Sequence, residues 1–146
     1  MRPLFALTAL ALTWEVSAMT TEFPDWSGFT PELAAAALPN LLATAEKSVA
    51  ALESNVATNA TYESTVWALT DATRDLWETW GQVCHELSVM NTPAWRKLEE
   101  DFQPKLVAFS LRIGQSRALY EATKRACAGE SDPLRRRVLE KSVQSA

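Results

Sequence analysis

A repeat of mostly apolar side chains, at alternating spacings of three and four residues, constrains the fold of this chain more than any other feature of its sequence. Its members are Val66, Leu69, Thr73, Leu76, Trp80, Val83, Leu87 and Met90. Such spacing places the side chains on one face of an α-helix as a heptad seam. We therefore expect a helix from about Thr61 to Met90, roughly 45 Å long at about 1.5 Å per residue, weakened only by Gly81.

A second apolar series follows after a short Asn91-Thr92-Pro93 turn. It consists of Phe102, Leu106, Phe109, Ile113 and Tyr120, with Ser116 between the last two. We expect a second long helix from about Pro93 to Ala128, bent by Pro104 and ended by Gly129. The short connection makes the two helices antiparallel neighbours, and no segment has the alternation of a strand. The predicted fold class is all-α, a helical bundle with two long antiparallel helices and shorter flanking helices.

Three helix starts share one signature, a capping side chain directly before a proline. They are Thr30-Pro31, Thr92-Pro93 and Asp132-Pro133, and Thr61 is a fourth candidate cap. The capping oxygen accepts a hydrogen bond from the first turn, and proline at the first helical position loses no needed donor. Within the first helical stretch, Pro39 should break or kink the helix before Asn40–Leu52.

The last helix, Leu134 to Val143, carries an apolar stripe for which the chain offers no further helix as a cover. Its members are Leu134, Val138, Leu139 and Val143. An exposed stripe of this kind promotes self-association. We therefore expect dimerisation or marginal stability of the chain.

The N-terminal region is excluded from the helical core. Residues 1–18 have one basic residue, an apolar run and a small-residue ending at Ala18, so they fit a signal peptide, whereas Met19 fits an ordinary start after a mis-assigned one. The protein is exported in the first case and cytoplasmic in the second. Residues 22–29 form an extended leader packed by aromatic side chains, and residues 19–146 form one helical domain that we expect to be incomplete.

The charge balance disfavours nucleic acid as a partner. The chain has 14 Lys and Arg against 18 Asp and Glu, a net charge of −4, whereas nucleic-acid binders usually have a basic excess. The run Arg135-Arg136-Arg137 is typical of a solvated helix face. No apolar run is long enough to span a membrane. Among six tryptophans, Trp67, Trp77 and Trp80 lie close together in sequence and are expected to supply much of the buried area.

The sequence has few groups that could carry chemistry. His85 is the only histidine, and His85-Glu86 resembles the start of the H-E-x-x-H zinc motif, but Val89 occupies the second histidine position. We expect His85 to be a surface or interhelix residue. Cys84 beside it projects about 100° away on a helix, and a pair of His85 with Cys127 has no supporting motif. The prediction is that the chain has no catalytic, cofactor-binding or metal-binding residue.

Two further groups have structural interpretations. Cys84 and Cys127 lack C-x-x-C spacing, so buried and unpaired thiols are the default, with a disulfide left open. The acidic run Glu99-Glu100-Asp101 lies early in a helix, where it complements the helix dipole.

From about Phe29 onward, the order of residues resembles the N-terminal region of the thimet oligopeptidase and oligopeptidase A family of zinc metallopeptidases. The similar segments are Phe29-Thr30-Pro31-Glu32, Tyr62–Leu69, Trp80–Pro93, Phe109–Gln115 and Leu119–Ala122. The run Trp80–Pro93, with its histidine, leucine and Asn-Thr-Pro turn, is the most specific of them. None of these segments is catalytic in the family.

The resemblance implies a helical scaffold that forms one wall of a channel for short peptides. It implies zinc in the complete parent enzyme and no cofactor in this chain, because the zinc motif lies far downstream in the family. The implied partners are the catalytic remainder of a peptidase and short peptides. The alternative is a stand-alone helical protein-interaction module without catalysis.

Overall fold

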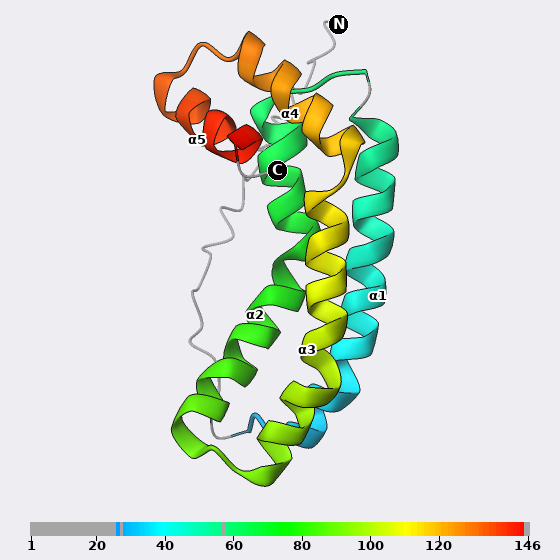
Figure 1. Cartoon of the computed structure of the whole chain (residues 1–146), viewed down its shortest axis with the longest axis vertical. Coiled ribbons are helices and arrows are strands. Elements are labelled where there is room, and N and C mark those ends of the chain that lie inside the picture. The colour runs from blue at the N-terminus through cyan, green and yellow to red at the C-terminus, as the bar shows by residue number, and fades with distance from the viewer. Residues whose placement is uncertain (1–25, 27, 57, 145–146) are drawn as a thin grey trace, which may run out of the picture.

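Five α-helices and one short π-helical turn account for the fold in a computed structural model of the chain, which describes residues 26, 28–56 and 58–144. Their order is α1 (Pro31–Asn55), η1 (Glu63–Trp67), α2 (Ala68–Met90), α3 (Pro93–Gly114), α4 (Arg117–Gly129) and α5 (Pro133–Gln144). Three long helices, α1, α2 and α3, run along the long axis of the molecule, and α4 and α5 gather at one end (Figure 1). The described residues contain no strand, and the predicted all-α bundle is confirmed.

All four predicted helix caps are present. The side-chain oxygens of Thr30, Thr92 and Asp132 accept hydrogen bonds from amides of the first turns of α1, α3 and α5, at 3.3, 3.4 and 2.9 Å. Thr61 accepts from the amide of Ser64 at 3.1 Å, and Ser64 Oγ accepts from the amide of Thr61 at 2.9 Å. The reciprocal pair satisfies two amides at the entry to η1 that would otherwise lack a partner.

The break expected at Pro39 does not occur. α1 is continuous from Pro31 to Asn55, and α3 likewise continues through Pro104. Both prolines lie on exposed faces, as do Ala35 and Glu100, whose carbonyl groups would otherwise accept from the missing amides. Water can solvate those carbonyls, so the lost hydrogen bond is less costly than in a buried helix.

The prediction of one continuous helix from about Pro93 to Ala128 is wrong. That segment is divided at Gln115 and Ser116 into α3 and α4. Ser116 has an extended backbone, with φ −72° and ψ 104°, and its hydroxyl accepts from the amide of Leu119 at 3.4 Å. The serine therefore caps a new helix instead of continuing the old one.

The seam of the first long helix faces the core. Leu76 and Val83 are buried with Thr73, while Leu69, Trp80 and Leu87 are partly buried against the same cluster. The seam fails at its end, where Met90 is 60% exposed because the helix stops at Asn91, a left-handed residue with φ 44°. The buried side of α3 supplies the opposite wall, formed by Trp95, Leu98, Phe102, Leu106 and Phe109.

The tryptophans contribute less to the core than expected. Trp67 is 54% exposed and Trp77 is 38% exposed, whereas Trp80 packs against the core with its ring 6.1 Å from that of Phe102. Trp67 and Trp77 lie beside the seam rather than on it. Among the tryptophans that the structure describes, the buried one is Trp95 of α3, which is 4% exposed and stacks on Phe29, with 5.6 Å between the ring centres.

α5 presents two different faces. Leu139 is fully buried, whereas Leu134 is 75% exposed and Val138 is 41% exposed. The exposed stripe is thus confirmed for Leu134 and Val138 and wrong for Leu139. All three arginines of the basic run are exposed, as expected, and Arg135 pairs with Glu63 at 2.6 Å and lies 5.3 Å from the centre of the Tyr62 ring.

Candidate functional site at the corner between α3 and α4

His85 lies where the sequence placed it, on the surface of a helix. It is exposed on α2, and its ring centre is 4.6 Å from that of Trp26. Cys127 lies on α4, and the end of α4 and the end of α2 are at opposite ends of the molecule (Figure 1). The thiol of Cys127 on α4 therefore does not lie near His85. Within the described residues, no three His, Cys, Asp or Glu side chains are grouped so that they could hold a metal ion.

The cysteines are free, and the expectation that both are buried is wrong. Cys84 is exposed and Cys127 is half-buried. Partial burial raises the pKa of the Cys84 thiol, and the negative charge of Glu99 raises it further. Both causes disfavour the thiolate, which is the nucleophilic form. Cys84 is therefore a poor candidate for covalent catalysis.

The candidate site is the corner at which α3 ends and α4 begins. The amide of Gln115 closes the last turn of α3 on Leu111 at 2.9 Å, and the amide of Ser116 bonds to the carbonyl of Ile113 at 3.0 Å. Ser116 then begins α4 as its cap. Two helices thus meet within two residues, and their ends expose backbone and side-chain polar groups together.

Glu53 near the end of α1 fastens this corner. Its carboxylate accepts from the Arg112 guanidinium at 2.9 Å and from the Ser116 hydroxyl at 2.6 Å. The Glu53 side chain is only 21% exposed, so these charge-assisted hydrogen bonds are partly shielded from water. A second tie lies nearby, where Arg125 of α4 donates to the carbonyl of Val56 at 3.2 Å. The end of α1 is therefore bound to both helices of the corner.

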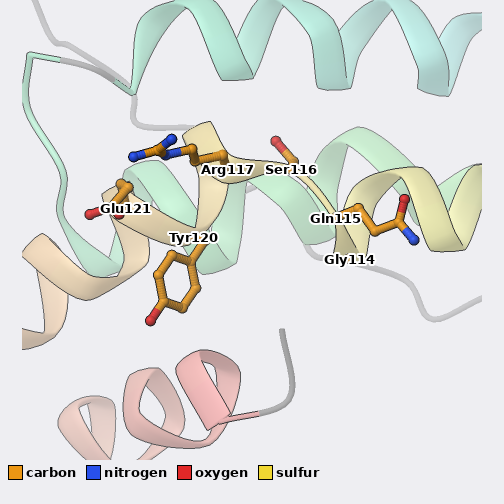
Figure 2. A pocket seen from close by; sticks show the side chains of 6 residues that line it. All are labelled: Gly114, Gln115, Ser116, Arg117, Tyr120 and Glu121. Carbon is orange, nitrogen blue, oxygen red and sulfur yellow. The ribbon is translucent and has the colours of Figure 1, made fainter.

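An open hollow of about 340 Å³ lies on the other side of the corner. It is lined by Gly114, Gln115, Ser116, Arg117, Tyr120 and Glu121. Figure 2 shows the phenol of Tyr120 pointing toward α5, away from the direction of the Ser116 hydroxyl, with Arg117 and Glu121 on neighbouring turns of α4. The described part of the chain offers no hydrogen-bond partner to the side chains of Gln115, Arg117, Tyr120 and Glu121. The hollow therefore presents both donors and acceptors to solvent.

The acidic run of α3 is a surface feature, as its position early in the helix suggested. Asp101 pairs with Lys97 at 2.8 Å within the exposed face of the helix. None of the helices that the structure describes combines the length and the apolar character needed to cross a bilayer.

The residues of the corner were not identified as a site from the sequence. Gly114-Gln115-Ser116 could have signalled a helix stop followed by a cap, because serine is a strong capping residue. Glu53 offered no such signal. Its partners Arg112 and Ser116 are 59 and 63 positions away, and only the packing of α1 on α3 and α4 brings them together.

An all-α scaffold domain is the class that this fold defines, and comparison with known proteins gives its family. Residues 38–146 match the family described as Neurolysin/Thimet oligopeptidase, N-terminal domain. The chain belongs to this family, and the resemblance seen in its sequence is confirmed, with the match beginning at Leu38 rather than at Phe29.

Two curated relatives share a shorter segment with the chain. A stretch of 45 residues is 47% identical to the organellar oligopeptidase A, chloroplastic/mitochondrial, of Arabidopsis thaliana. A stretch of 45 residues is 44% identical to the probable cytosolic oligopeptidase A of the same plant. Each match covers 31% of this chain and 6% of the relative. The chain thus corresponds to a small part of each of these proteins.

Proposed function

We propose that this chain is the N-terminal scaffold and substrate-channel wall of a zinc-dependent oligopeptidase that cleaves short peptides. The observation that carries the proposal is the family match over residues 38–146. In the proposal, residues 19–146 are one incomplete domain, and the zinc site belongs to a catalytic part outside this sequence. One histidine is too few for a catalytic zinc site of the H-E-x-x-H type, which needs two from that motif.

The hollow at the α3–α4 corner is the part of the wall that we assign to peptide contact. A peptide in extended form presents amide donors and carbonyl acceptors, and the side chains of Gln115, Arg117 and Glu121 can bond to both kinds of group. Tyr120 adds an aromatic face with a hydroxyl at its end. The Glu53 contacts hold the corner in place, so these side chains are presented from a fixed backbone.

The first test uses the chain alone in a quenched-fluorescent peptide assay with added zinc. We expect no cleavage, because His85 has no second ligand on its helix. Cleavage that needs zinc, stops with a chelator and is lost in His85→Ala would contradict the proposed scaffold role and make His85 a ligand.

The second test places the chain in an active enzyme. Residues 38–146, which match the family's N-terminal domain, replace the corresponding domain of the organellar oligopeptidase A of Arabidopsis thaliana, and peptide cleavage is measured. We expect the chimera to cleave short peptides, and Arg117→Ala with Tyr120→Ala to raise KM more than kcat falls. Arg136→Ala on α5 is the matched control. A soluble, zinc-loaded chimera without activity would argue for the stand-alone interaction module instead.

A further inference from the structure

α5 packs on the rest of the described molecule through the face that carries Leu139. Leu139 is fully buried, and Arg135 pairs with Glu63 and lies over Tyr62. The opposite face projects Leu134, the most exposed large apolar side chain of the described residues, and Val138 one turn later. Residues four apart lie beside each other on a helix, so Leu134 and Val138 form one apolar ridge.

This ridge is basic at its edge. Arg137 is exposed and follows Leu134 by three positions, so these two side chains are neighbours on the helix surface. α5 as a whole carries three arginines and one lysine against one glutamate, although the net charge of the chain is −4. A basic helix on an acidic protein is complementary to the remaining surface of that same protein.

A matching acidic groove runs between α1 and α2. It has a volume of about 300 Å³, and its lining residues are Leu41, Thr44, Ala45, Ser48, Ala68, Asp71, Ala72, Asp75 and Leu76. The small side chains of Ala45, Ala68 and Ala72 leave the groove open, because larger side chains there would fill it. Asp71 pairs with Arg74 at 2.7 Å, whereas Asp75 has no ion-pair partner among the described residues. The groove therefore offers an apolar floor and an unpaired carboxylate at its rim.

The ridge and the groove of one molecule do not meet. α5 packs on α4, and in Figure 1 it lies on the other side of α2 from α1. A groove of this size can take the side chains of Leu134 and Val138, and Asp75 can pair with Arg137 at its edge. We propose that the outer face of α5 docks into the α1–α2 groove of a second copy of this chain.

The contact joins two different surfaces, so it is heterologous and leaves one ridge and one groove unoccupied in every pair. Such a contact either closes into a ring or extends. This inference is independent of the peptide contact assigned to the corner hollow, because it rests on α1, α2 and α5 and uses no residue of that hollow.

Sedimentation velocity across micromolar concentrations at low and high salt is the primary measurement. We expect the average mass to rise above that of one chain with concentration and to fall with added salt, because a charge pair at the rim is screened. A wild-type chain that stays monomeric at the highest concentration and lowest salt would overturn the proposal. Monomers that instead bind vesicles containing anionic lipid through Arg137 would assign the ridge to a membrane surface.

Charge reversal tests the two surfaces separately. Arg137→Glu and Asp75→Arg should each weaken association about tenfold or more, as reversal of an interfacial charge does. The double variant Arg137→Glu with Asp75→Arg restores opposite charges and should regain most of the association. Arg136→Glu on α5 and Glu100→Arg on α3 make the same charge changes outside the two surfaces and should leave association near the wild-type level.

A second pair of variants tests the heterologous geometry. Leu134→Gln with Val138→Gln removes the ridge, and Asp75→Arg disables the groove, so each protein alone should be monomeric. Mixed together, they still provide one intact ridge and one intact groove, and should form pairs of two chains that grow no further. Equal association of all variants, or a mixture that stays monomeric, would contradict the assignment. Circular dichroism of each variant verifies that it is folded.

Discussion

Cys84 and His85 are neighbours in sequence, yet their side chains lie in different surroundings. The Cys84 thiol is shifted toward its neutral form by partial burial and by the carboxylate of Glu99. His85 lies against the ring of Trp26. Consecutive helical residues project in different directions, so the two side chains act in separate environments.

The raised pKa of Cys84 predicts slow alkylation. At a given pH, a higher pKa means a smaller fraction of thiolate, so iodoacetamide should react more slowly with Cys84 in the folded chain than with the same cysteine in denaturant. The midpoint of the rate against pH should lie higher in the folded protein. Cys127→Ser provides a background with Cys84 as the single thiol.

Glu99→Gln is expected to increase the alkylation rate, because it removes the charge that disfavours the thiolate. Glu100→Gln, at the next position, is the matched control. Equal rates in the two variants would contradict the role given to Glu99.

At the scale of the elements, local chemistry predicted where helices begin, and distant contacts decided where one of them ends. The caps Thr30, Thr92 and Asp132 could be predicted because each capping oxygen and the amide that it binds lie within four residues of sequence. The division between α3 and α4 escaped prediction because the apolar spacing continues across it. The corner is fixed by Glu53, which packing alone brings to Ser116.

Ser116→Ala should therefore destabilise the chain by roughly 1–3 kcal/mol, since it removes a helix cap and a hydrogen bond to a carboxylate. Urea unfolding followed by circular dichroism measures the change. Ser54→Ala is the control, because its exposed hydroxyl bonds only to the carbonyl of Ala50 in its own helix. We expect a change within about 0.5 kcal/mol there. Equal losses in both variants would count against the corner as a fastening point.

For the molecule as a whole, the apolar periodicity predicted the fold class and most of the core, but among the proposed functional surfaces it indicated only the exposed stripe of α5. Leu76 and Val83 of the seam are buried in one core cluster with side chains of α1 and α3. The corner hollow is lined by one short segment, residues 114–121, where α3 ends and α4 begins, whereas the α1–α2 groove arises from chain segments far apart in sequence. Periodicity along one helix carries no information about such neighbours.

Leu76→Ala should cost roughly 2–5 kcal/mol of unfolding free energy, because the side chain is 1% exposed and its removal leaves a cavity. Leu134→Ala makes the same chemical change at a site that is 75% exposed and should cost less than about 0.5 kcal/mol. The comparison is made by urea unfolding at concentrations where the chain is monomeric. Similar costs at the two positions would mean that the assigned core is wrong.

The unequal burial of the tryptophans determines what the intrinsic fluorescence of this protein reports. Trp26, Trp67 and Trp77 are 41%, 54% and 38% exposed in the folded chain, so unfolding changes the exposure of these rings less than that of Trp95. Trp95 is 4% exposed and stacked on Phe29, so its emission should shift most when the structure opens. The optical signal therefore follows the start of α3 and its contact with the leader more closely than it follows α5.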